Sequence, residues 1–178
     1  VVFVGGLTGD VEGEEMTVNY PGFAGGDRTD LRLLALLQRD GRATNADIAA
    51  QVNLSPSACL RRIQRLEATG VIAGYAARVD PKAVGLGLQA FVRVQLERHD
   101  PASVQQFGDR VQAWDEVVAC YALTGDMDYL LHVVVQDLEH VSRFLLDNLL
   151  NASGVADVNS SFVLRAVKTD GGLPLPGA

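Results

Sequence analysis

Several residue types and patterns are scarce in this chain of 178 residues, and each scarcity narrows its possible functions. There are only two cysteines, Cys59 and Cys120, so we expect neither a disulfide framework nor a cysteine metal cluster. No apolar run approaches the ~18 residues that a membrane-spanning helix needs. The apolar start is too short for a secretory signal, and no basic residue precedes it. These observations predict a cytoplasmic protein that is not associated with a membrane.

Clusters of catalytic residue types are also missing. The three histidines, at positions 99, 132 and 140, are scattered, and no ligand spacing for a metal or nucleophile–base pattern accompanies them. The sequence therefore predicts no catalytic residues, no metal, no cofactor and no enzymatic activity.

Positive charge is scarce overall, but it is unevenly distributed. The net charge is −7, and residues 27–70 are the exception, with seven arginines against five acids. Residues 1–26 carry four acids and no base, and residues 71–178 carry eight bases against thirteen acids. A basic segment within an acidic chain favours a small nucleic-acid-binding module over a uniformly basic surface.

Three apolar-striped segments in this basic region are predicted to be helices. They span Asp27–Arg39, Asn45–Val52 and Pro56–Thr69. The second is capped by Thr44 or Asn45, and Ser55 is the expected N-cap of the third. A small residue where two helices cross, Ala49, and a turn residue that tolerates positive φ, Asn53, complete the pattern of a helix-turn-helix.

The third helix carries the residues expected to contact double-stranded DNA. At 100° per residue, Cys59, Leu60, Ile63 and Leu66 cluster on one side, and Ser57, Arg61 and Arg65 lie opposite. Arginine pairs with guanine edges or grips phosphate, so we expect Ser57, Arg61 and Arg65 to face bases and Arg62 to contact phosphate. The predicted DNA-binding set is Ser55, Ser57, Ala58, Arg61, Arg62 and Arg65. A solvated helix face is the plain alternative for this arginine run.

After Gly70 the hydrophobic period changes. Residues 71–79 are expected to form a linker that contains a strand, and the remainder predicts the order βαββαβ, with both helices on one face of an antiparallel sheet. The expected strands are Leu88–Leu96, Val117–Leu123, Tyr129–Val135 and Val155–Val167, with helices over residues 102–112 and 138–150. The other face of this sheet needs cover, which a second subunit can supply.

The fold class is therefore α+β: an N-terminal (winged) helix-turn-helix, a linker strand and a C-terminal ferredoxin-like domain. The expected regions are a disordered or loosely attached arm (1–26), the helix-turn-helix (27–74), the linker (75–87), the ferredoxin-like domain (88–168) and a tail (169–178).

With this helix-turn-helix and this order of elements, the sequence resembles the Lrp/AsnC family of leucine- and asparagine-responsive regulators. The resemblance covers about residues 27–168 and rests on Asp30–Gly41, Asn53–Glu67, Gly70–Tyr75 and the turn Thr124–Leu131 (TGDMDYLL). It implies homodimers that assemble further to tetramers or octamers. It also implies an amino-acid effector bound between dimers, where Asp126 or Asp128 would accept its ammonium. The effector-binding set is Leu123, Thr124, Gly125, Asp126, Asp128 and Ser160.

The leading hypothesis is a sequence-specific DNA-binding transcriptional regulator controlled by a small molecule. Two alternatives are weighed against it. One is an architectural protein that coats DNA without an effector, which salt dependence and the specificity ratio would separate. The other is an enzyme that resembles siroheme decarboxylases, but the H-N-Y-x-R motif of those enzymes is absent from this chain.

Overall fold

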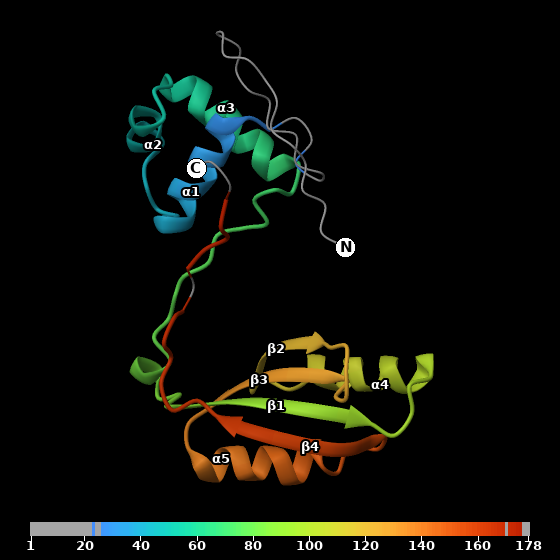
Figure 1. Ribbon diagram of the computed structural model, residues 1–178. Coiled ribbons are helices and arrows are strands. Elements are labelled where there is room, and N and C mark those ends of the chain that lie inside the picture. The colour runs from blue at the N-terminus through green and yellow to red at the C-terminus, as the bar shows by residue number, and fades with distance from the viewer. Residues whose placement is uncertain (1–22, 24–25, 170, 176–178) are drawn as a thin grey trace. The chain divides into compact units, whose positions relative to one another are not determined.

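The computed structural model describes residues 23, 26–169 and 171–175, and the predicted N-terminal arm lies almost wholly outside them (Figure 1). The chain divides into two compact units. One contains residues 1–77 together with residues 170–178, and the other contains residues 78–169. The chain therefore passes between the units twice.

The first unit is built from three helices: α1 (Arg28–Arg39), α2 (Asn45–Gln51) and α3 (Pro56–Ala68). Thr44 and Ser55 cap the second and third helices, because their hydroxyls accept the backbone N–H groups of Asp47 and Ala58. The turn between these helices depends on Asn53, which has a φ of 56°, a conformation that asparagine tolerates better than most residues. The helix-turn-helix prediction is confirmed.

The core of this unit is small. Leu33, Ile48, Cys59 and Ile63 pack together, and Ala49 is 1% exposed at the point where α2 and α3 meet. Full burial of each aliphatic side chain contributes roughly 1.5–3 kcal/mol. These contacts fix which face of α3 points inward, and therefore which face is presented to solvent.

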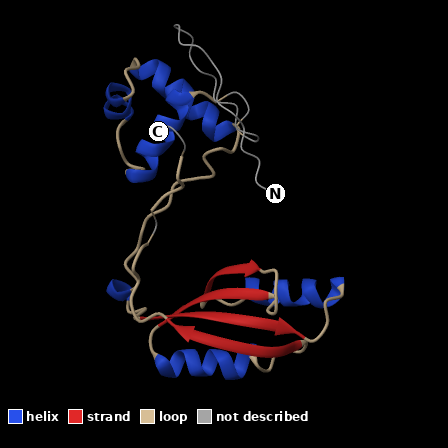
Figure 2. Ribbon diagram, in the orientation of Figure 1, coloured by secondary structure: helices blue, strands red, loops and turns tan. Residues whose placement is uncertain are grey.

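The second unit has the predicted βαββαβ order. Its elements are β1 (Leu88–Leu96), α4 (Pro101–Gln112), β2 (Val117–Ala122), β3 (Tyr129–Val135), α5 (Leu138–Arg143), which continues as the π-helix η2 (Phe144–Leu149), and β4 (Val155–Phe162). A 3₁₀ turn, η1 (Lys82–Val84), precedes them. The sheet order is β2-β3-β1-β4, and every neighbouring pair is antiparallel. Figure 2 shows the strands as one layer.

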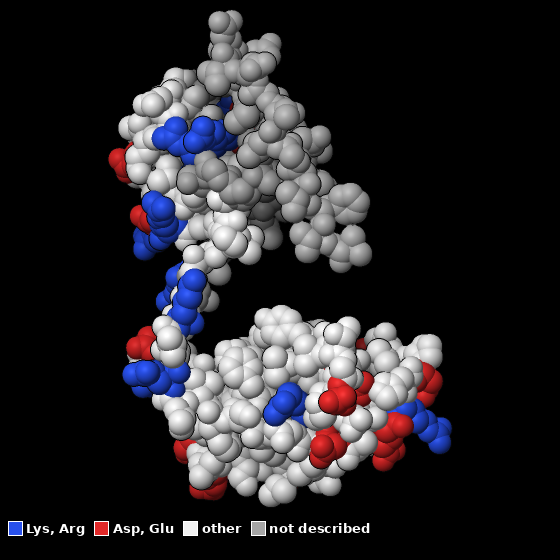
Figure 3. Space-filling view, in the orientation of Figure 1, with Lys and Arg blue, Asp and Glu red and all other residues white. Residues whose placement is uncertain are grey.

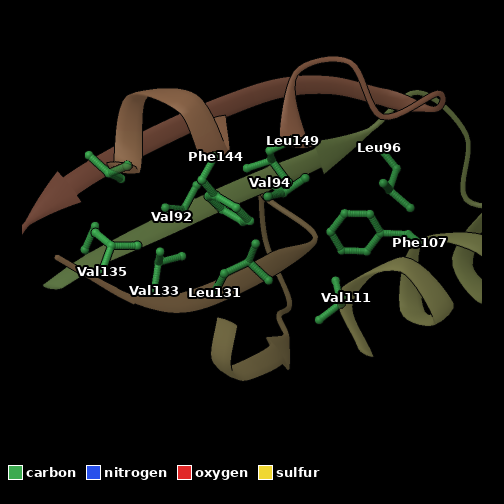
Figure 4. Close-up of a cluster of buried hydrophobic side chains, with 12 residues drawn as sticks. Val92, Val94, Leu96, Phe107, Val111, Leu131, Val133, Val135, Phe144 and Leu149 are labelled. Atoms are coloured by element: carbon green, nitrogen blue, oxygen red, sulfur yellow. The ribbon is translucent and has the colours of Figure 1, made fainter. Parts of the chain in front are cut away.

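Alternation along the strands places one face of this sheet against the helices. Val92 and Val94 of β1 are fully buried beside Leu131 and Val133 of β3, and Phe144 of η2 packs on them (Figure 4). On the opposite face Phe91 stacks on His132, with ring centroids 4.8 Å apart. Burial lowers the pKa of His132 below 6.5, so its ring is neutral near pH 7.

Two predicted strands differ in the structure. Residues 71–79, all described, form no strand, since no ladder of backbone hydrogen bonds pairs them with another described segment. The last strand ends at Phe162 rather than Val167. Val163 still donates its N–H to the carbonyl of Gln89, but β1 begins at Leu88 and so has no residue opposite the chain beyond Leu164.

Candidate nucleic-acid interface and ligand-binding turn

The exposed face of α3 differs from the predicted one at two positions, Gln64 and Leu60. Ser57, Arg61 and Gln64 are all exposed, and Gln64 lies only about 20° from Ser57 around the helix axis at 100° per residue. Within the described residues, neither Arg61 nor Gln64 has a side-chain partner. Gln64, which is not part of the predicted DNA-binding set, therefore belongs to the outward face.

Leu60 departs from the expected apolar side. It was grouped with the buried residues Cys59, Ile63 and Leu66, yet it is 45% exposed. The reason is angular: Leu60 is about 100° from the centre of that buried group, so it lies at the margin where α3 meets solvent. It extends the solvent-facing surface of the helix with an apolar side chain.

Two of the predicted DNA-binding arginines are held by carboxylates at the start of α1. Arg62 Nη1 donates to Asp27 Oδ2 at 2.6 Å and to Asp30 Oδ1 at 3.0 Å, and Arg65 Nη2 donates to Asp30 Oδ2. Asp30 is 0% exposed and also accepts the N–H of Asp27 in a reciprocal capping box. This cluster, Asp27–Asp30–Arg62–Arg65, ties the third helix to the first.

The electrostatics of this cluster favour the charged form of Asp27. Burial alone would raise the pKa of Asp27, but the N–H of Asp30 and the guanidinium of Arg62 lower it overall below 3.8. A depressed pKa in the folded state means that the contribution of Asp27 to stability is present above about pH 4 and is lost as the pH falls further. Near neutral pH the cluster therefore stabilises the position of α3.

The two arginines differ in their exposure to solvent. Arg62 is half-buried between both acids, whereas the side chain of Arg65 is 45% exposed beside Asp30. The remaining members of the predicted set lie at the start of α3. Ser55 caps the helix and shares a hydrogen bond with Ser57 (Oγ to Oγ, 3.2 Å), and Ala58 is partly exposed.

A sequence signal for this cluster exists. Asp30 is three, four and seven residues before Leu33, Leu34 and Leu37, so it shares their apolar face on a helix. A carboxylate on a buried face is almost always paired. That signal predicts a buried cationic partner, although it does not identify which arginine.

The predicted effector-binding turn joins β2 and β3. Leu123, Thr124, Gly125 and Asp126 are exposed, and Gly125 has a φ of 117°, which favours glycine. The N–H of Leu123 donates to the carbonyl of Asp128 and closes the turn. The turn thus presents a carboxylate and backbone groups to solvent.

The two aspartates of the turn have different surroundings. Asp128 Oδ2 accepts the N–H of Leu96 at 2.7 Å, and its Oδ1 is 2.8 Å from His99 Nε2. Within the described residues Asp126 has no side-chain partner. Asp128 therefore fixes the turn to the end of β1, and Asp126 is the available carboxylate.

Ser160 does not join the turn within one chain. It lies on β4 opposite Val92, and β1 separates β4 from β3 in the sheet. Two strand spacings of about 4.8 Å place β4 roughly 10 Å from β3. The structure thus brings five of the six predicted effector residues together and leaves the sixth apart.

Charge divides between the units as the sequence suggested. On the face drawn in Figure 3, basic side chains predominate on the helix-turn-helix unit, while acidic ones are prominent on the other unit. No described helix is long and apolar enough to cross a membrane. Among the same residues no group of three or more metal-ligating side chains comes together.

A helix-turn-helix with an exposed arginine, followed by a separate α+β domain, defines a DNA-binding regulator with a ligand-binding domain. Residues 26–73 match the family described as winged helix-turn-helix DNA-binding, and residues 89–173 match the Lrp/AsnC ligand binding domain. The leucine-responsive regulatory protein of Escherichia coli K12 is 39% identical over 142 residues, which cover 80% of this chain and 87% of that protein. The chain belongs to the Lrp/AsnC family of transcriptional regulators.

Solved structures agree with this assignment. A transcriptional regulator from Neisseria meningitidis, in complex with L-Met, is similar with a TM-score of 0.81 and 46% identity, covering 84% of this chain and 97% of that one. An AsnC family regulator from Agrobacterium tumefaciens has a TM-score of 0.80 and 36% identity, with the same coverage of both chains. The family resemblance, the fold class and the regulatory function predicted from sequence are confirmed.

Proposed function

We propose that this regulator reads DNA bases with the outward face of α3, chiefly through Ser57, Arg61 and Gln64. The observation that carries the proposal is the contrast along one helix: Arg62 is held by two acids, whereas Arg61 and Gln64 are exposed without partners among the described residues. Arginine pairs bidentately with guanine, and glutamine with adenine, in the major groove.

Arg62 and Arg65 take supporting roles in this proposal. Arg62 orients the helix through Asp27 and Asp30, and its phosphate contact from the sequence analysis becomes secondary. The exposed part of Arg65 remains a candidate for base or phosphate contact. Ser55 and Ala58 lie at the start of the helix, where backbone and hydroxyl groups reach phosphates that set the register on the duplex.

The effector is proposed to be a free amino acid bound at the turn 123–128. Asp126 would accept its ammonium group, and the exposed backbone of the turn would hold its carboxylate. Because the similar regulator from Neisseria meningitidis binds L-Met, methionine is the first ligand to test. We propose that the effector lies between subunits, with Ser160 supplied by a second copy of the chain; the separation of β4 from β3 by β1 supports this arrangement.

Replacing Asp126 with alanine is expected to abolish the change in DNA affinity that the amino acid produces, while the unliganded affinity stays near wild type. The side chain makes no contact that the fold requires. Titration of a labelled duplex with and without L-methionine, and then each other amino acid, measures this effect. A full effector response in Asp126→Ala would remove this residue from the site.

Asp128→Ala serves as the comparison because it should behave differently. It removes the acceptor for the N–H of Leu96, and loss of a hydrogen bond to a charged group costs about 1.5–3 kcal/mol. We therefore expect the ligand-binding domain of Asp128→Ala to be less stable than wild type. Its stability has to be measured before any change in its effector binding is interpreted.

The homodimer is proposed to form through the sheet face that the helices leave uncovered. Phe91 stacks on His132 on this face and is 39% exposed. Arg93, two residues further along β1, donates a hydrogen bond to Asn159 Oδ1 at 2.9 Å. Exposed aromatic side chains on a sheet face are common in protein interfaces.

Phe91→Asp should convert the dimer or higher oligomer to a monomer, because it places an unpaired charge at the centre of that face. Leu146→Asp is the matched control, since Leu146 is 55% exposed on η2, away from the sheet's open face. Sedimentation velocity measures both variants. Dissociation of the Leu146 variant with retention of the Phe91 oligomer would place the interface elsewhere.

A further inference from the structure

The chain segment that follows the ligand-binding domain returns to the helix-turn-helix unit. Residues 170–178 group with residues 1–77, and Leu173 is hydrogen-bonded to Gln38 of α1. The segment begins only a few residues after β4, the last strand of the ligand-binding domain. It was expected to be a separate tail, and the sequence gives no periodic signal for its contact with α1.

The contact has a specific hydrogen-bonding geometry. The N–H of Leu173 donates to Gln38 Oε1, and Gln38 Nε2 donates to the carbonyl of Leu173 at 3.3 Å. One glutamine amide thus satisfies both main-chain groups of one tail residue, in the manner of a strand pair. An amide side chain that bonds both groups recognises extended backbone rather than a particular side chain.

Gly172, which has no side chain, allows the main chain of the tail to lie close to the side chain of Gln38. Its φ is 70°, and a Cβ added there would lie 3.0 Å from Gln38 Oε1. Both the conformation and the lack of space favour glycine at this position. A bulkier residue would strain the backbone and push the tail away from Gln38.

An apolar cavity adjoins the hydrogen-bonded contact. Its volume is about 530 Å³, and its lining includes Leu31, Leu34 and Leu37 of α1, Ile72, Tyr75 and the tail residue Leu175. Leu175 is half-buried, whereas Leu173 remains 74% exposed. The side chain of Leu175 and the main chain of Leu173 are therefore the two anchors.

We propose that Gly172–Leu175 is a docking element, and that the groove between α1 and residues 71–75 is its receptor. Docking gives the DNA-binding unit a second chain connection to the ligand-binding domain, in addition to the one that follows Ala77. The element is joined to β4 by residues 163–171 and is hydrogen-bonded to Gln38 of α1, so it carries the state of the ligand-binding domain to the DNA-binding unit. This last step rests on the proposed function.

Hydrogen exchange of the full chain tests the docking directly. Amides of the tail peptide should exchange slowly in the wild type and near the unprotected rate in Gly172→Ala, Leu175→Ala and Gln38→Ala. Leu164→Ala is the matched control, because Leu164 is 99% exposed in the same stretch of chain. Unchanged protection of α3 peptides shows that the unit still folds. A wild-type tail that exchanges at the unprotected rate, or equal tail protection in all variants, would overturn the docking.

The coupling is tested by DNA affinity with and without each of the twenty standard amino acids. In Leu175→Ala the ratio of the two affinities should move toward one, and in Leu164→Ala it should keep the wild-type value. An unchanged ratio in an undocked Leu175→Ala would overturn the coupling and leave the docking intact. If no amino acid changes the wild-type affinity, the proposed effector fails, and hydrogen exchange still decides the docking.

Discussion

Replacing Asp30 with alanine is expected to destabilise the helix-turn-helix unit by about 2–3 kcal/mol, because it removes the common partner of two arginines. The carboxylate is completely buried, and its loss also leaves the N–H of Asp27 without its capping partner. Arg62 and Arg65 are partly exposed and can regain water, so the cost is below that of a fully buried pair. Denaturant unfolding followed by hydrogen exchange in α1–α3 peptides measures this change.

Asp40→Ala is the matched control for that experiment. Asp40 is exposed, and among the described residues its carboxylate accepts only the N–H of Arg42, so loss of this side chain should keep the stability within about 0.5 kcal/mol of wild type. The single tryptophan, Trp114, lies in the other unit, and its fluorescence should report unchanged stability there. Equal stability of the Asp30 and Asp40 variants would contradict the structural role of the cluster.

Arg61→Ala is expected to weaken binding to a specific duplex by about 1–3 kcal/mol, or roughly 5- to 150-fold, without loss of stability. Arg61 is exposed, and no described residue holds its side chain. Base preference should relax at one position of the site, because a bidentate contact to a base is lost. Selection of duplexes from a random pool, followed by titration of the selected sequence, measures both effects.

Three comparison variants sharpen this prediction. Arg143→Ala removes an exposed arginine from the ligand-binding domain and should leave DNA affinity unchanged. Gln64→Ala should relax preference at a different base position. Arg62→Ala should lower stability and affinity together, since it breaks the contacts with Asp27 and Asp30. Wild-type affinity and base preference in Arg61→Ala would remove this residue from the base-reading face.

Local patterns predicted most of the fold. The caps at Thr44 and Ser55, the positive φ of Asn53 and the alternation in β1 each depend on residues within a few positions of one another. Hydrophobic periodicity and turn chemistry are encoded over such distances. The order of elements followed from them, and so did the sheet that this order usually forms.

Long-range pairing could not be predicted in the same way. Arg62 lies 32 residues from Asp30, and Leu173 lies 135 residues from Gln38. An arginine at the side of a helix faces either solvent or a carboxylate, depending on how that helix crosses its neighbour. A helical-wheel projection of one helix holds no information about that crossing. The assignment of Arg62 to phosphate and of the tail to an independent region both omitted this information.

The most direct test of the account is the affinity of the full chain for a selected duplex and for a random one, each with and without the twenty amino acids. We predict that the selected duplex binds at least about 10³-fold more tightly at physiological salt. We also predict that one amino acid changes that affinity by roughly 5- to 150-fold. Equal affinity for both duplexes, with no response to any amino acid, would contradict the account and favour an architectural DNA-coating protein.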